Sequence, residues 1–80
     1  MSKPTFTLTS QHQIPTEKLN LIAFRLGCVC GNPRFKYEQQ PVIGYHGLYV
    51  VNFTATRKLP AKHVAACRAL ILGVELGVTL

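Results

Sequence analysis

The sequence predicts one small α+β domain: a helix, a small antiparallel sheet of two or three strands, and a second helix. Both helices are expected on one face of the sheet. Apolar residues with helical spacing lie at Thr16–Leu26, alanines are concentrated at Pro60–Leu76, and β-branched and aromatic residues dominate the segment between them. The 80 residues are 48% hydrophobic and only 15% charged, which suits one small core and argues against disorder.

The N-terminal residues 1–14 are predicted to form a flexible arm, and residues 15–80 the folded domain. The arm is polar and rich in Thr, Ser and Gln. An alternation of apolar and polar residues around Phe6 and Leu8 makes a short edge strand the alternative for this segment.

The first helix is predicted at Thr16–Leu26. Thr16 can cap its N-terminus, Glu17 suits its first turn, and Gly27 is expected to end it. A stripe with helical spacing is expected to face the sheet, and its members are Leu19, Ile22, Ala23 and Leu26.

The β region begins after a Gly-Asn-Pro turn at 31–33, which leads into a strand at Phe35–Gln40. Pro41 has no N–H to donate, which argues against an interior position in the sheet. Val42–Tyr45 and Leu48–Thr56 are rich in β-branched and aromatic residues, so one or two further strands are expected there. Glycines on either side of His46 offer a turn.

The second helix is predicted at Pro60–Leu76, because alanines favour helix and proline is well tolerated in a first turn. A face of small side chains is expected to let a sheet or helix approach closely, and it consists of Ala61, Ala65, Ala69 and Leu72. Arg57, Lys58 and Lys62 surround the helix start, where free N–H groups and positive partial charge favour an anion. The start of this helix is therefore a predicted anion site.

The segment Ala61–Leu70, AKHVAACRAL, resembles the second helix of double-stranded-RNA-binding domains. The pattern of that family reads K-K-x-A-K-x-x-A-A-x-x-A-L. Lys58 and Lys62 match its first and last lysines, and Leu59 replaces the middle one. The order helix, β region, helix is also found in this family.

The resemblance implies a second contact region. Gly44–His46 resembles the loop with which the family enters the minor groove, so His46 is expected to lie there. The chain after this loop is shorter than two strands of the family require, so one strand is expected to be shortened or missing. On the first helix, Leu21 stands where the family usually offers an acid or amide, and Glu17 and Asn20 are the nearby substitutes.

Charge and resemblance together predict the function. Nine Lys and Arg against three Asp and Glu give a net charge of +6 and a pI near 9.7, which predicts a polyanionic partner. The resemblance implies sequence-independent binding of double-stranded RNA, and apolar residues left over on both helices predict that the domain is a homodimer. The residues expected to bind RNA are Arg57, Lys58, Lys62, His63, His46, Glu17 and Asn20. A solvated cationic rim without such a partner is the alternative.

Apolar residues left over on both helices predict contact with a second chain. The expected interface consists of Leu21, Phe24, Cys67, Leu70, Ile71 and Val74. The alternative function is therefore a protein-interaction or dimerisation module that resembles the RNA-binding domains and has lost RNA binding. A further alternative is that Leu70 and Ile71 complete the core of the domain itself.

No catalytic site and no cofactor are predicted, because three acids offer no acid–base pair and no group is found that would orient a Cys–His pair. No metal site is predicted either. A Cys₃His zinc set is the weaker alternative, and it would consist of Cys28, Cys30, His63 and Cys67.

Three cysteines are an odd number, and no apolar run approaches the roughly 20 residues of a membrane span. These observations predict a soluble intracellular protein, in the cytoplasm or nucleus, with reduced thiols and no membrane partner.

Overall fold

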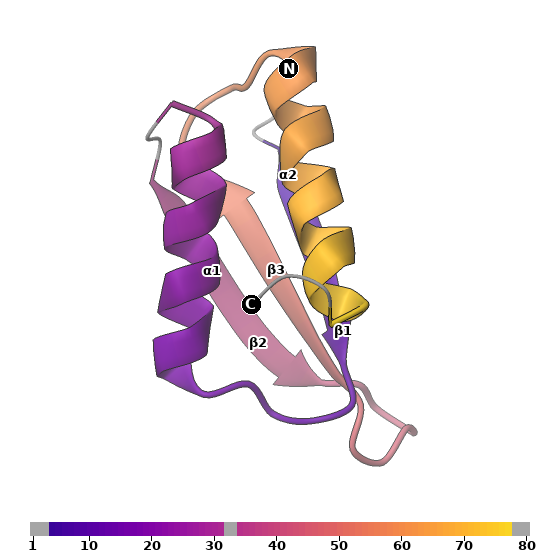
Figure 1. Ribbon diagram of the computed structural model, residues 1–80. Coiled ribbons are helices and arrows are strands. Elements are labelled where there is room, and N and C mark those ends of the chain that lie inside the picture. Colours follow the sequence, from indigo (N-terminus) through magenta and orange to yellow (C-terminus); the bar gives the residue numbers. More distant parts are fainter. Residues whose placement is uncertain (1–3, 32–33, 78–80) are drawn as a thin grey trace.

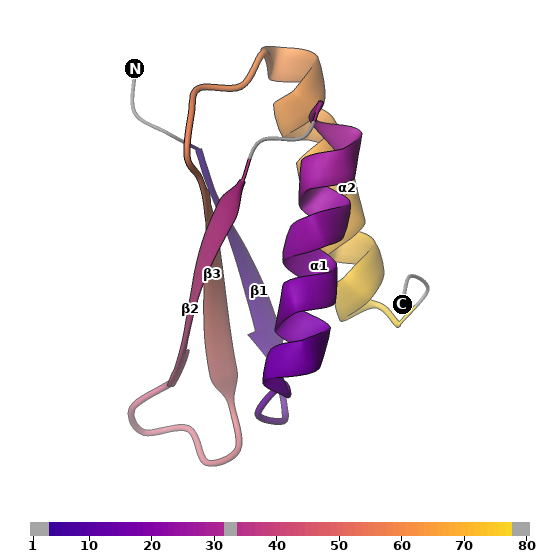
Figure 2. The same ribbon diagram turned by 90° about the vertical axis from the view of Figure 1, so that its left-hand side faces the viewer.

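A computed structural model describes residues 4–31 and 34–77. The elements follow one another as β1 (Thr5–Ser10), α1 (Thr16–Val29), β2 (Phe35–Pro41), β3 (Tyr49–Ala55) and α2 (Ala61–Glu75). Both helices cover the same face of the sheet, α1 over β2 and α2 over β1 (Figures 1 and 2). The predicted α+β class and the placement of both helices on one sheet face are confirmed.

The sheet has three antiparallel strands in the order β1-β3-β2, so β3 lies in the centre. Pro41 is the last residue of β2, and β2 is an edge strand, as the missing N–H of proline requires. The segment Val42–Tyr45 is not a strand. It lies in the β2–β3 loop, where the N–H of Val42 donates to the carbonyl of Leu48 at 2.9 Å.

The prediction of a flexible arm is wrong for residues 5–10, which form β1. Phe6 and Leu8 are 3% and 1% exposed, because they face the helices and fill the space beside Phe53. The Ala55 N–H donates to the Pro4 carbonyl at 3.0 Å and continues the pairing beyond the strand. The third strand of the sheet thus comes from the N-terminal segment. The chain between the β2–β3 loop and α2 supplies one strand, β3.

The α1 helix starts at Thr16, as predicted, but extends beyond Leu26 to Val29. Thr16 does not cap it: the N-cap is Pro15, whose carbonyl accepts the N–H groups of Lys18 and Leu19, both at 3.0 Å. Gly27 is buried within the helix. The chain turns only at Gly31, which has a φ of 78° and supplies the left-handed conformation that often follows a helix C-terminus.

The α2 helix has the predicted location but the opposite orientation about its axis. Ala61, Ala65 and Ala69 are exposed, and Leu72 is 56% exposed. The helix turns its larger side chains inward, because they bury more apolar surface than alanines do. Cys67 and Ile71 are buried, and the residues packed against the core beside them are Val64, Leu70 and Val74.

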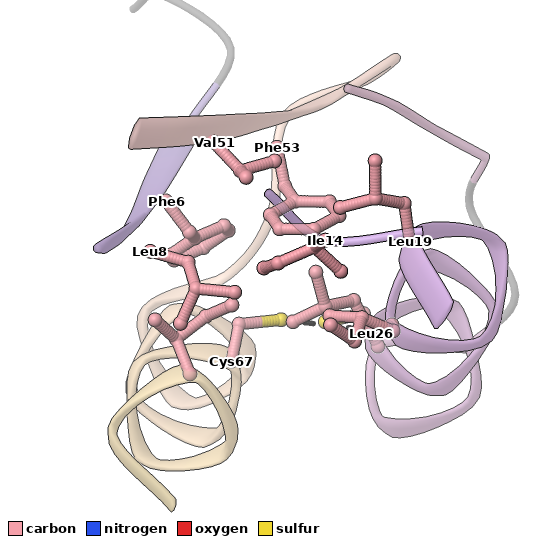
Figure 3. Close-up of a cluster of buried hydrophobic side chains, with 11 residues drawn as sticks. Phe6, Leu8, Ile14, Leu19, Leu26, Val51, Phe53 and Cys67 are labelled. Carbon is pink, nitrogen blue, oxygen red and sulfur yellow. Dashed lines mark hydrogen bonds between the residues drawn. The ribbon is translucent and has the colours of Figure 1, made fainter. Parts of the chain in front are cut away.

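The predicted interface on α2 is therefore wrong. Cys67, Leu70, Ile71 and Val74 belong to the core of the domain or pack against it. Figure 3 shows how side chains from the sheet and both helices meet in this core, with the Cys67 sulfur directed toward Leu26 of α1. Leu21 and Phe24 of α1 do remain exposed, at 44% and 68%.

Candidate nucleic-acid interface

Five exposed cations gather at the end of the domain where β3 leads into α2. They come from the start of β2, from the β3–α2 connection and from the first turn of α2: Arg34, Lys36, Arg57, Lys58 and Lys62. We call this group the basic end. The pairing of Phe35 with Ala55 brings the start of β2 beside the end of β3, so the five residues lie at the same end of the domain. Lys36, the partner of Thr54, is on the uncovered face of the sheet, opposite the helices. They are five of the nine Lys and Arg residues of the chain.

Hydrogen bonds hold the two connections at the basic end together. The backbone N–H and the hydroxyl of Thr56 both donate to the Arg34 carbonyl, at 3.0 and 2.9 Å. The Arg57 guanidinium donates to the Gly31 carbonyl at 3.1 Å. The backbone that carries Arg34 and Arg57 is therefore fixed, which keeps these cations close together.

The N-terminus of α2 opens toward the same end. Its N-cap is Pro60, which makes no side-chain hydrogen bond, and its first turn holds no acid. The Pro60 carbonyl accepts the N–H groups of His63 and Val64, at 2.9 and 3.1 Å, whereas those of Ala61 and Lys62 bond to nothing in residues 4–31 and 34–77. Cations beside a helix N-terminus destabilise the helix, because that end already carries positive partial charge. A bound phosphate offsets this repulsion and accepts the free N–H groups.

The other predicted RNA-binding residues lie elsewhere. His46 is in the β2–β3 loop, at the bottom of Figure 1, while the basic end is at the top. Glu17 is in the first turn of α1, which also starts at the bottom. The Asn20 side-chain oxygen accepts the Tyr37 hydroxyl at 2.6 Å, so this residue fastens α1 to β2.

The predicted RNA-binding residues therefore lie at two opposite ends of the domain. Arg57, Lys58 and Lys62 lie together, whereas His46 and Glu17 lie at the far end. The reason is topological: no strand stands between β3 and α2, so α2 starts where β3 ends, away from the β2–β3 loop. His63 lies near the basic end but is half-buried, with its carbonyl accepting the Cys30 thiol at 3.7 Å.

Arg34 and Lys36 were not among the predicted site residues. Their position follows from the register of β2 against β3, in which Lys36 is the partner of Thr54. The signal was present in the sequence, since a hairpin between Phe35–Gln40 and Leu48–Thr56 places the start of the first strand beside the end of the second.

The uncovered face of the sheet is polar. Alternation along the strands turns Thr5, Thr7, Asn52 and Thr54 toward it, and the Thr7 hydroxyl donates to the Asn52 side-chain oxygen at 2.8 Å. Four of the five strand aromatics form two ring pairs on the helix side, Phe6 with Phe35 and Tyr37 with Phe53. The fifth, Tyr49, alternates in phase with the buried Val51 and Phe53 and so also lies on that side. Within the described strands, this open face therefore offers no aromatic platform on which single-stranded bases could stack.

Two of the three cysteines belong to the core. Cys30 and Cys67 are buried and Cys28 is exposed. Burial, a hydrogen bond with Cys30 and the charge of Cys30 raise the pKa of the Cys67 thiol to about 12. This thiol therefore stays protonated at neutral pH and is a poor nucleophile.

The alternative zinc set is not assembled. In the described part of the chain, no three His, Cys, Asp or Glu side chains are grouped so that they could hold a metal ion. Cys28 faces solvent while Cys30 and Cys67 belong to the core, so Cys28, Cys30, His63 and Cys67 do not surround one point.

Within the described residues, no helix is both long enough and apolar enough to cross a membrane. Comparison with protein-family models, with curated proteins and with solved structures finds no match to this chain.

Proposed function

We propose that this domain binds the phosphate backbone of double-stranded RNA through its basic end, without preference for sequence. The observation that carries the proposal is the group of five exposed cations at the end of the domain where α2 begins, together with an α2 N-terminus that has neither a side-chain cap nor an acid in its first turn. Lysine and arginine contacts to phosphates supply the sequence-independent part of nucleic-acid affinity. The resemblance of the start of α2 to double-stranded-RNA-binding domains supports RNA as the ligand.

The lack of aromatic side chains on the uncovered face of the described sheet favours duplex RNA over single-stranded RNA as the ligand. Proteins that bind single strands without sequence preference stack bases on aromatic side chains, and here the strand aromatics face the helices. A duplex presents closely spaced phosphates that one compact group of cations can contact. Since His46 lies at the far end, one domain contacts one stretch of backbone, and we expect moderate, strongly salt-dependent affinity.

The test is a titration of a short RNA duplex at several salt concentrations, followed by fluorescence anisotropy. The double variant Lys58→Ala with Lys62→Ala should lower the affinity by about tenfold or more and reduce the salt slope by about two units. The matched control is Lys18→Ala with Arg25→Ala, which removes the same charge from exposed positions on α1.

Equal losses in the two double variants would show that only net charge matters and would contradict a site at the basic end. No binding by the unmodified domain at low salt would contradict RNA binding itself. A duplex DNA and a single-stranded RNA of the same length complete the comparison, and tighter binding of either one would also contradict the proposal.

A protein-interaction module is the second candidate function. It is favoured by the outward side of α1, where Leu21 and Phe24 are one turn apart and 44% and 68% exposed. A domain that binds no RNA but loses self-association in the variant Leu21→Ser with Phe24→Ser would support this candidate.

A further inference from the structure

The outer edge of β1 is open. In an antiparallel ladder, alternate residues direct their N–H and C=O groups toward the neighbouring strand and the others direct theirs away. Pro4 pairs with Ala55, so Phe6 and Leu8 bond to β3, and Thr5, Thr7 and Thr9 direct their backbone groups outward. The Thr9 N–H indeed leaves the sheet and donates to the Glu75 carboxylate of α2 at 3.3 Å.

This edge lacks the features that keep other strand edges from pairing. The opposite edge strand, β2, carries Lys36, Glu38 and a terminal Pro41, all of which discourage an added strand. In contrast, β1 has no charged residue and no proline between Thr5 and Ser10. Within the described residues, the outward N–H groups of Thr5 and Thr7 have no hydrogen-bond partner.

A shallow groove follows this edge along α2. It is lined by Thr5 and Thr7 of β1 and by Arg68, Leu72 and Glu75 of α2. The strand and the helix run in the same direction, away from the basic end (Figure 1). The hydrogen bond to Thr9 places Glu75 beside the end of β1. Arg68 comes two helical turns earlier and therefore lies near the level of Thr5. Leu72 lies between Arg68 and Glu75, near Thr7.

The groove is therefore complementary to itself. A two-fold axis near Thr7 and Leu72 would place a cation opposite an anion at both ends, since Arg68 of each copy would face the partner's Glu75. The same axis would pair Thr7 with the partner's Thr7, both of which direct their backbone groups outward. The 56% exposed Leu72 would meet its own copy at the centre.

We propose that this domain forms a homodimer in which β1 pairs antiparallel with β1 of a second copy, joining the two sheets. Leu72 packs against Leu72 of the other copy across the axis. Glu75 releases the Thr9 N–H and forms an ion pair with Arg68 of the other copy. The Thr9 N–H then bonds to the second strand. A second copy is the occupant because strand register and charge both repeat under the two-fold axis. The proposal does not depend on RNA binding, and it uses a surface other than Leu21 and Phe24.

The test is sedimentation equilibrium of the full chain, free of nucleic acid, with far-UV circular dichroism to verify folding. The unmodified protein should be a dimer at about 100 µM. Arg68→Glu or Glu75→Arg should each weaken the dimer about tenfold or more, because like charges then face each other. The exchange of both, Arg68→Glu with Glu75→Arg, should restore it.

Two further variants separate this surface from others. Thr7→Pro removes an outward N–H that β3 does not use and should give a folded monomer, whereas Arg25→Glu changes the charge as Arg68→Glu does and should leave the dimer intact. A native monomer at about 100 µM would overturn the proposal. So would a dimer that survives Arg68→Glu, a charge exchange without rescue, or a dimer lost in Leu21→Ser. If Thr7→Pro does not fold, the charge exchange still decides.

Discussion

The two helices cover the same face of the sheet but present different outer surfaces. On its outward side α1 carries large apolar residues, Leu21 and Phe24, and its first turn contains Glu17. On its outward side α2 carries alanines, and its first turn contains no acid. The inner sides are alike, because each helix turns its own bulky aliphatic residues toward Phe53 and its neighbours. The core therefore constrains only the inner face of each helix, and the outer faces are free to differ.

The largest effect should come from the buried face of α2. Ile71→Ala should lower the free energy of unfolding by about 2–4 kcal/mol, because it removes buried methyl groups and leaves a cavity. The matched change on the outer face of α1, Phe24→Ala, should cost less than about 0.5 kcal/mol, because Phe24 is 68% exposed. Urea unfolding measures both values. A larger cost for Phe24→Ala would mean that the outer side of α1 is covered in solution.

A smaller effect should come from Cys67, where α2 meets α1. The folded domain keeps the Cys67 thiol protonated, with a pKa of about 12 against an ordinary value of 9.0. Above about pH 9 the unfolded chain releases this proton while the folded chain retains it. The free energy of unfolding should therefore fall by about 1 kcal/mol from about pH 8 to about pH 10.

The variant Cys67→Ala isolates this contribution from the other groups that titrate at high pH. It should be less stable at both pH values, because it loses buried volume, but its stability should fall less steeply between them. Urea unfolding of both proteins at the two pH values supplies the comparison. Identical pH dependence in the two proteins would show that the thiol ionises equally in the folded and unfolded chains.

The smallest effect concerns the two helix starts, both of which have proline as N-cap. Asp at an N-cap accepts backbone N–H groups, so Pro15→Asp and Pro60→Asp should each raise stability by about 0.5 kcal/mol after the lost rigidity of proline is included. Only Pro60→Asp places an anion beside Lys58 and Lys62, so only this variant should weaken RNA binding. Thermal unfolding and the RNA titration check both expectations, and equal RNA affinity of the two variants would contradict them.

Helices and their buried faces are predicted best from the sequence where large apolar residues recur with helical spacing. The stripe of Leu19, Ile22 and Leu26 predicts both α1 and its buried side, because three large aliphatic residues recur there with helical spacing. On α2 a face of alanines and a face of larger residues compete, and spacing alone does not rank them by the surface they bury. The face that the core buries carries Val64, Ile71 and Val74, which are larger than the alanines on the other face.

Long-range pairing explains what sequence patterns missed. The alternation at Phe6 and Leu8 is too short to decide between a strand and a flexible arm, and the partner strand lies far along the chain. The positions of Arg57, Lys58 and Lys62 at one helix start follow from local pattern. Their separation from His46 does not follow from local pattern. It arises because α2 begins after the end of β3, whereas His46 lies in the loop before the start of β3.

The two ladders of β3 differ in how far apart their strands are in the chain. The β2–β3 hairpin closes across residues 42–48, whereas the Thr7–Asn52 bond spans 45 residues. Closing the longer loop costs more chain entropy before any contact is gained. The hairpin is therefore expected to form early in folding and β1 to dock late. During synthesis, β1 therefore leaves the ribosome before α1, β2 and β3, and it stays unpaired until β3 has also emerged.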